Sequence, residues 1–331
     1  MKHITDNIIQ NVKSSLKNVE KIVIITHFNP DGDAVGSSLA LYHYLIKHQY
    51  KVSIIIPNRA PRFLKWLPGN EKIYIFEDTF DESKALINES DLTFFLDFNV
   101  INRTQGMENY LKALSTKKIL IDHHPEPENF ADIIISSTDV SSTSELLYEF
   151  IISLGNENDI NKDIAECLYT GIMTDTGSFS YNSSLSQTYY IVSKLIEKGI
   201  DKDKIYWKVY DNYSVDRIRL LGYCLNKKLK VLPEYATAYI SITRKELDVF
   251  NYETGDSEGF VNYPLSIKGI VFSVIFIEHD EHVKISFRSK GAFYANRFAR
   301  NHFNGGGHQN AAGGNSEASL EETLQNFENK F

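Results

Sequence analysis

The chain has 331 residues, of which 42% are hydrophobic and 24% charged, and its formal net charge is -8. This length is enough for one large or two medium domains with a sizeable hydrophobic core. The negative charge excludes a broad, non-specific coat for duplex DNA, which requires many phosphate contacts, whereas metal ions or a local basic patch can still attract nucleic acid to a single site.

The first half of the chain alternates short apolar runs with stretches of helical spacing. This alternation is typical of a mostly parallel sheet that is covered by helices on both faces, and it predicts an α/β domain. The expected strands are Ile22–Thr26, Val52–Ile56, Leu92–Leu96 and Lys118–Ile121, and the expected helices are Ala34–Lys47, Thr143–Leu154 and Asp163–Thr174.

The second half becomes helical and polar between about residues 185 and 227 and then returns to strand-like patterns. We therefore predict an N-terminal α/β domain at 1–190, a helical connector at 191–226 and a smaller α/β domain at 227–331, with a cleft between the two domains. In the last part we expect strands at Leu229–Leu232, Thr237–Ile242, Ile270–Ile277 and Val283–Arg288, a helix near Ala292–Asn301, a glycine-rich loop at 304–314 and a helical tail from Leu320.

The cysteines and the apolar segments bear on the compartment. Cys167 and Cys224 have no C-x-x-C spacing, so a zinc knuckle or a disulfide framework is not indicated. Residues 1–20 lack the apolar core of a signal peptide, and the longest apolar stretch, Gly269–Ile277, is far shorter than a membrane span. We expect a cytoplasmic protein that does not enter a membrane.

Acidic and histidine side chains follow three of the expected strands. In an open parallel sheet, functional groups gather outside the carboxyl ends of the strands. Three strands that deliver such residues to the same edge predict one converging site. Its members are His27, Asp31 and Asp33 after the first strand, Asp97 after another, and Asp122, His123 and His124 after a third.

The side chains of this site indicate a metal centre. Carboxylates held close together repel one another, and a bound cation removes that repulsion. A mixture of carboxylates and imidazoles favours Mn²⁺, Co²⁺, Fe²⁺ or Mg²⁺ over a structural zinc ion. The spacing H-x₃-D-x-D allows one loop to serve two adjacent metals, which a neighbouring Asp would bridge. Asp175, at the end of an amphipathic helix, is a further candidate ligand.

A different signal lies near the C-terminus, in the segment NGGGHQNAAGG. Glycine runs expose backbone N–H groups that can wrap an anion, so Gly306, Gly307 and His308 are candidate phosphate-binding residues. From residue 282 to 316 there are five Lys or Arg residues and no Asp or Glu. Among them Arg288, at the end of an expected strand, is the best candidate for a forked contact with phosphate.

Taken together, these motifs resemble the DHH phosphoesterase superfamily, and the triplet Asp122-His123-His124 corresponds to the one that names it. The GGGH segment resembles the DHHA1 domain, a phosphate- and nucleic-acid-contacting module. The resemblance covers nearly the whole chain and implies a DHH metal-binding catalytic domain at 1–190 and a DHHA1 substrate-binding domain at 227–331. Within the superfamily the chain is most similar to the nanoRNase group.

The resemblance also implies a role for each matching residue. His27 and Asp31 would hold a first metal, and Asp97 would bridge both metals. His124 and Asp122 are the expected catalytic residues, with His124 near the scissile phosphate. Arg288, His308, Gly306, Gly307 and Arg103 are expected to bind substrate, and Asp33, His123 and Asp175 to hold the second metal. The metals would be two Mn²⁺ ions, with Mg²⁺ or Co²⁺ as alternatives.

We therefore predict a phosphoesterase that hydrolyses short oligoribonucleotides to mononucleotides and converts 3′-phosphoadenosine-5′-phosphate (PAP) to AMP and phosphate. A phosphodiesterase for cyclic dinucleotides or linear dinucleotides such as pApA uses the same site chemistry and stays open. The GGGH segment disfavours a pyrophosphatase or exopolyphosphatase, and the complete set of metal residues disfavours a non-catalytic nucleotide- or RNA-binding protein. The sequence does not distinguish a monomer from a homodimer.

Overall fold

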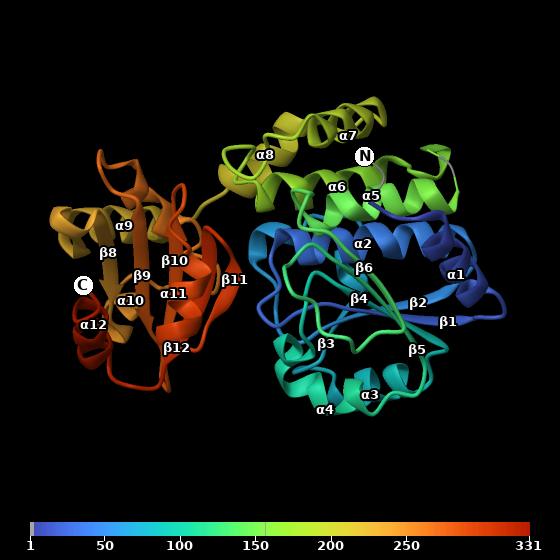
Figure 1. Cartoon of the computed structure of the whole chain (residues 1–331), viewed down its shortest axis with the longest axis horizontal. Coiled ribbons are helices and arrows are strands. Elements are labelled where there is room, and N and C mark those ends of the chain that lie inside the picture. Colours follow the sequence, from blue (N-terminus) through green and yellow to red (C-terminus); the bar gives the residue numbers. More distant parts are fainter. Residues whose placement is uncertain (1–2, 156) are drawn as a thin grey trace. The chain divides into compact units, whose positions relative to one another are not determined.

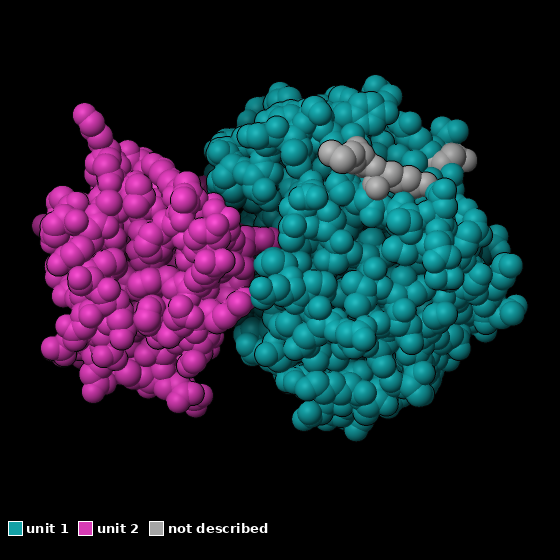
Figure 2. Space-filling model, viewed as in Figure 1, with its two compact units in different colours: residues 1–212 teal, residues 213–331 magenta. Residues whose placement is uncertain are grey.

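The computed structural model describes residues 3–155 and 157–331, so three residues of the predicted N-terminal domain lie outside the described residues. The chain divides into two compact units, Met1–Asn212 and Tyr213–Phe331 (Figure 2). The predicted connector, 191–226, thus falls partly in each unit. No helix in the described part of the chain is long and apolar enough to cross a membrane.

The first unit is built on a six-stranded sheet with the order β3-β2-β1-β4-β5-β6. Every neighbouring pair is parallel, which confirms the predicted sheet type. The sequence pattern missed β3 and β6, which are short and lie at the two edges. The strands are β1 (Lys21–Ile25), β2 (Lys51–Ile56), β3 (Ile73–Ile75), β4 (Leu92–Leu96), β5 (Lys117–Asp122) and β6 (Ile133–Ser136).

Helices cover both faces of this sheet (Figure 1). All five residues of β4 are buried, and its alternating side chains enter different cores: Phe94 packs in one and Phe95 in the other. One core lies under α1 (Asp6–Leu16), α2 (Gly32–Lys47), α5 (Thr143–Leu154), α6 (Lys162–Asp175), α7 (Ser186–Glu197) and α8 (Lys202–Tyr210); the other lies under α3 (Phe80–Asn88) and α4 (Glu108–Lys112).

Two glycines allow α2 and α6 to pack very closely. A Cβ atom on Gly36 would lie 2.6 Å from the carbonyl oxygen of Cys167 and 3.1 Å from the nitrogen of Gly171. Gly36 lies one turn after Asp33 in α2, and Gly171 lies one turn before Asp175 in α6. The close packing of these helices therefore brings two candidate metal ligands toward the same place.

The second unit contains a mixed six-stranded sheet with the order β11-β12-β10-β9-β8-β7. Only β8 and β9 pair in parallel; the other neighbours are antiparallel. The predicted smaller α/β domain is thereby confirmed in fold class. Its elements are α9 (Val215–Tyr223), β7 (Leu229–Leu232), β8 (Thr237–Ile242), α10 (Arg244–Val249), β9 (Phe272–Glu278), β10 (Val283–Ser289), α11 (Ala295–His302), β11 (Gly306–His308), β12 (Ala311–Ser316) and α12 (Leu320–Glu328).

The prediction of a glycine-rich loop at 304–314 was wrong in one respect. Most of this segment forms the antiparallel pair β11–β12 at the edge of the second sheet. A Cβ on Gly305 would lie only 2.1 Å from the carbonyl oxygen of Gly313, and one on Gly314 2.6 Å from that of Phe303. The glycines here permit close approach of backbones, which composition alone does not distinguish from loop flexibility.

Replacing Gly36 with Ala should destabilise the first unit by about 1–3 kcal/mol, because the added methyl group would overlap the α6 backbone. Thermal or urea unfolding would measure this. Gly222→Ala in α9 is the matched control: nothing lies within 4 Å of its added Cβ, so it should be neutral or stabilise by about 0.4–1 kcal/mol. Equal effects of the two substitutions would contradict the argument from close packing.

Candidate metal centre

The candidate ligands lie at the carboxyl ends of β1, β4 and β5, at the edge where the order of the parallel sheet reverses. The strand β1 lies between β2 and β4: the chain continues from β1 to β2 and β3 on one side, and β4, β5 and β6 follow on the other side. Such a switch point leaves a crevice at the carboxyl edge in which open α/β sheets bind their ligands. His27, Asp97 and His123 all lie here, and each is at most 3% exposed.

A first group of ligand-type side chains consists of His27, Asp31 and Asp97, whose nearest donor atoms all lie within 4.8 Å of one another. His27 contacts the carbonyl oxygen of Phe28 through Nδ1 at 2.9 Å, which leaves Nε2 to face Asp97. Asp31 caps α2: its Oδ1 accepts hydrogen bonds from the backbone of Asp33 and Ala34. Its other carboxylate oxygen stays available for a cation.

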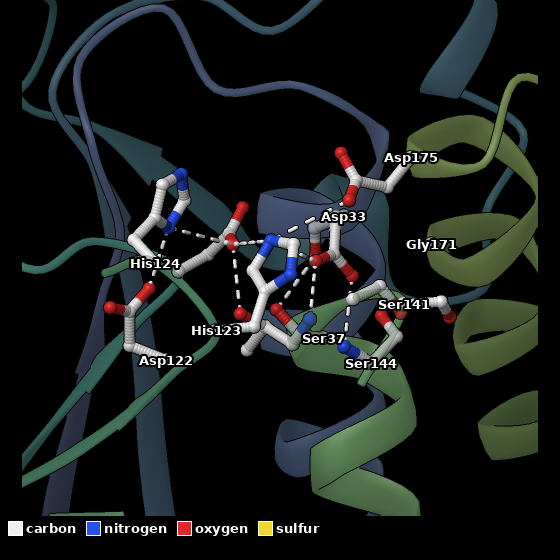
Figure 3. A network of polar contacts seen from close by, with 12 residues as sticks. Asp33, Ser37, Asp122, His123, His124, Ser141, Ser144, Gly171 and Asp175 are labelled. Carbon is white, nitrogen blue, oxygen red and sulfur yellow. Dashed lines mark hydrogen bonds and ion pairs between the residues drawn. The ribbon is translucent and has the colours of Figure 1, made fainter. Parts of the chain in front are cut away.

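A second group consists of Asp33, His123 and Asp175. The Nε2 atom of His123 lies 3.5 Å from Asp175, 3.5 Å from Oδ1 of Asp97 and 3.8 Å from Asp33 (Figure 3). These separations are too long for good hydrogen bonds but suit ligands of one ion, each about 2.1 Å from it. The first and second groups meet at Asp97.

An unpartnered buried atom supports the fit of a cation to the first group. Among the described residues, Nε2 of His27 is buried and has no hydrogen-bond partner. Burial, followed by the charge of Arg103, lowers the pKa of His27 to about 4, so its ring is neutral at pH 7. A neutral imidazole with a free Nε2 and with Nδ1–H directed to a carbonyl is the form that binds metal ions.

The carboxylates of the site are buried close to one another and repel one another when ionised. Burial, and then the neighbouring Asp31, Asp175 and Asp122, raise the pKa of Asp97 well above its usual range. Burial and the charge of Asp97 do the same for Asp33. Without a cation, these groups would hold protons that a metal site must release. The donor set and its charge therefore fit divalent ions.

His124 belongs to a third group of ligand-type side chains, together with Asp97 and Asp122. Its Nδ1 contacts Oδ1 of Asp122 at 2.7 Å, and its Nε2 contacts Nη1 of Arg103 at 3.0 Å. Since the guanidinium can only donate, Nε2 accepts and Nδ1 carries the proton that His124 donates to Asp122. Burial raises the pKa of Asp122 to about 7. The predicted catalytic residues and Arg103 thus form one chain of contacts.

The sequence interpretation missed the turn that begins α5. The backbone nitrogens of Thr143 and Ser144 donate to the carboxylate of Asp33, and the Thr143 hydroxyl donates to Asp97. The segment SSTSE does carry a signal, since Ser142 three residues before Glu145 is typical of a helix start. That pattern predicts a cap, and only the fold places the cap against the candidate ligands.

In the second unit, the structure brings Arg288 and His308 to one face of the sheet. Both pair with Ala311 of β12, Arg288 from β10 and His308 from β11. Directly paired residues of antiparallel strands point to the same face, so these two side chains share it. The Nε atom of Arg288 is buried and, within the described part of the chain, has no hydrogen-bond partner. Gly306 and Gly307 lie in β11 beside His308.

Comparisons with known proteins agree with this architecture. A model described as "DHH family, N-terminal domain" matches residues 21–172, and one described as "DHHA1 domain" matches residues 234–331. Several curated relatives bear the name bifunctional oligoribonuclease and PAP phosphatase NrnA, among them proteins from Bacillus subtilis and Thermus thermophilus. The one from Bacillus subtilis is 26% identical over 89% of this chain and 88% of its own length. The one from Thermus thermophilus is 29% identical over 91% of this chain and 86% of its own length.

A solved structure is also similar over nearly the whole chain. It is an exopolyphosphatase-related protein from Bacteroides fragilis, with a TM-score of 0.94 and 47% sequence identity, and the match covers 99% of this chain and 96% of that chain. The folds described above are therefore shared with a protein whose structure was determined by experiment.

Replacing Asp97 with Asn should stabilise the metal-free protein at pH 7 by roughly 1–3 kcal/mol, because a neutral amide avoids the cost of protonating a carboxyl group that is ionised in the unfolded chain. Ionisation of a carboxyl with a raised pKa destabilises the fold only above the unfolded value of about 3.9, so the difference should shrink as pH falls from 7 toward 4. Urea unfolding with a chelator measures it. Added Mn²⁺ should stabilise the wild type only, and a metal-free variant less stable than the wild type would contradict this reasoning.

Proposed function

This chain is a metal-dependent phosphoesterase of the DHH family, and we propose that it hydrolyses short oligoribonucleotides to mononucleotides and PAP to AMP and phosphate. One observation carries the two-metal part of the proposal. The buried Asp97 carboxylate lies 3.5 Å from His27 through Oδ2 and 3.5 Å from His123 through Oδ1. One carboxylate is therefore shared by two groups of ligand-type side chains, as a bridging ligand must be.

In this proposal His27 and Asp31 hold one divalent ion, and Asp97 contributes to both. Mn²⁺ is the proposed metal, with Mg²⁺ or Co²⁺ as alternatives, because mixed carboxylate and imidazole ligands suit these ions. When bound, such ions supply an activated water near neutral pH and stabilise negative charge on a phosphoryl group. Asp33, His123 and Asp175 would hold the other ion.

The protein's own groups around the ions would orient the substrate phosphate. Because His124 donates its Nδ1 proton to Asp122, its ring is fixed with Nε2 beside Arg103. We propose that Arg103 faces the non-bridging oxygens of the scissile phosphate, where its charge offsets the developing negative charge, and that His124, beside it, orients the guanidinium by accepting its hydrogen bond. Asp122 holds the ring in place and keeps the proton on Nδ1.

We propose that the second unit binds the rest of the nucleotide. Arg288 and His308 lie on the same face of its sheet, on either side of β12, and a guanidinium and an imidazole on one face suit a phosphate or a ribose hydroxyl. Gly306 and Gly307 add backbone groups at the edge of the sheet, where no side chain obstructs an anion.

A second candidate activity is the hydrolysis of polyphosphate. It is supported by the similarity to the Bacteroides fragilis protein, which is described as exopolyphosphatase-related and is 47% identical. Polyphosphate would need the metal ligands and Arg288 but no group that contacts a base or a ribose. The two candidates therefore predict different substrate preferences.

The two candidates can be separated by measuring hydrolysis with Mn²⁺ on one panel of substrates. The panel contains RNA of two to five nucleotides, a 24-nucleotide RNA, PAP, pApA, a cyclic dinucleotide, pyrophosphate and polyphosphate. We expect rapid release of mononucleotides from the shortest RNA, phosphate from PAP, and slow reaction of the long RNA. Activity confined to polyphosphate or pyrophosphate would refute the proposed substrates while leaving the metal centre intact.

Replacing His308 with Ala should raise the KM for PAP by roughly ten- to hundredfold, because it would remove a hydrogen bond to a charged phosphate group. The affinity for Mn²⁺, measured by calorimetry, should not change. His302→Ala is the matched control, since His302 is an exposed histidine on α11 of the same unit. An unchanged KM in the His308 variant would remove this residue from the proposed substrate site.

A further inference from the structure

We propose that Thr143 and Glu145, in the turn that begins α5, are positioning residues that set the carboxylates of Asp33 and Asp97 for metal binding. This inference rests on the proposed metal centre and concerns residues outside its ligand set. Neither residue belongs to the groups of ligand-type side chains described above. Their effect would be exerted through hydrogen bonds to the ligands and to the turn.

The turn contacts both carboxylates directly. The backbone nitrogen of Thr143 lies 2.6 Å from Oδ2 of Asp33, and that of Ser144 lies 2.9 Å from its Oδ1 (Figure 3). The Thr143 hydroxyl lies 2.8 Å from Oδ1 of Asp97. One residue, Thr143, thus holds a carboxylate in the first turn of α2 with its backbone and one at the end of β4 with its side chain.

These contacts determine how each carboxylate is rotated. A carboxylate oxygen has two lone pairs, so an oxygen that accepts one hydrogen bond can still bind a cation. With its Oδ1 held by Thr143, Asp97 directs Oδ1 toward His123 and Oδ2 toward His27. Rotation of the carboxylate would separate it from one of the two histidines. The Thr143 hydroxyl also donates to Asp97, which lies among other carboxylates, and this hydrogen bond offsets part of the repulsion between them when no cation is bound.

Glu145 holds this turn in place. It is fully buried, and its Oε2 accepts hydrogen bonds from the backbone and the hydroxyl of Ser141 and, at 2.8 Å, from Thr188 of α7. Its Oε1 is buried without a hydrogen-bond partner among the described residues. Burying a carboxyl group with one unpaired oxygen costs free energy of folding, so its presence here calls for an explanation. Its hydrogen bonds fix Ser141, two residues before Thr143, whose backbone and hydroxyl donate to Asp33 and Asp97.

The turn is also fixed from the side of α6. A Cβ on Gly171 would lie 2.0 Å from the Ser144 hydroxyl and 2.7 Å from Oδ1 of Asp33. The turn therefore packs directly on α6 and cannot retreat from Asp33 without losing that packing. Ser142 alone, whose hydroxyl accepts from the backbone of Glu145, is sufficient to cap the helix. The Thr143–Asp97 bond is not required for helix formation, which indicates a role at the site.

The test is the affinity for Mn²⁺, measured by calorimetry on the full chain without substrate. Thr143→Val removes the hydroxyl at nearly constant volume, and we expect it to weaken Mn²⁺ binding by roughly 10- to 100-fold. Thr143→Ser keeps the hydroxyl and should restore near wild-type affinity. Thr93→Val is the matched control, because Thr93 is fully buried on β4 and its hydroxyl contacts the hydroxyl of Ser90, away from the candidate ligands.

The metal-free stability of each variant separates positioning from folding. If Thr143→Val and Thr93→Val lose similar stability in a chelator but only the former loses Mn²⁺ affinity, the proposal is supported. Affinity within twofold of the wild type would overturn it. If Thr143→Val does not fold, Thr143→Ala removes the same hydroxyl; if neither folds and Thr143→Ser does, the residue is structural and the proposal fails.

Glu145→Gln provides an independent test of the second residue. The amide keeps one acceptor oxygen and nearly the same volume, but it removes the charge that attracts the Ser141 and Thr188 donors. We expect weaker Mn²⁺ binding with the same substrate KM, and unchanged affinity would remove Glu145 from the proposal. Because these experiments measure metal binding, they do not depend on the substrate. A wild type that binds Mn²⁺ but hydrolyses no substrate of the panel would refute the proposed function alone, whereas one that binds no divalent ion would refute the metal centre.

Discussion

The arrangement of the first unit depends on one constraint: several carboxyl groups are buried within a few ångströms of one another. Burial raises the pKa of Asp33 and Asp97, so their ionised forms are unfavourable in the absence of a cation. Packing of the hydrophobic core does not require buried carboxyl groups, and apolar residues at these positions would make the protein more stable. The unfavourable charge is the physical reason for regarding this edge of the sheet as a metal centre.

The rest of the unit maintains that arrangement. The parallel sheet places the carboxyl ends of β1, β4 and β5 side by side. The order of the strands reverses at β1, and such a switch point leaves a crevice at the carboxyl edge of the sheet. Gly36 and Gly171 let α2 and α6 approach until Asp33 and Asp175 meet. The start of α5 then supplies hydrogen-bond donors to the same carboxylates. Each of these features limits how far the ligands can move apart under their mutual repulsion.

The second unit uses different means for a different chemistry. Its sheet is mixed, and its edge pair β11–β12 is rich in glycine, which allows backbones to approach one another closely there. Arg288 and His308 share a face because both pair with Ala311. Neutralising phosphate charge with side chains rather than metals suits a substrate-binding role, as we propose for this unit.

The sequence by itself determined the strand ends and the residue types at them, since apolar runs and the Asp and His residues that follow them are local features. The parallel sheet then places His27, Asp97 and His123 together with no further assumption. It also determined the two-unit α/β class, but not that the glycine-rich segment forms strands, because glycine suits both loops and close backbone pairs. Only the tertiary structure decided that the start of α5 lies on Asp33 and Asp97. That contact joins residues 46 positions apart or more, and no local pattern records which distant carboxylate a helix start will meet.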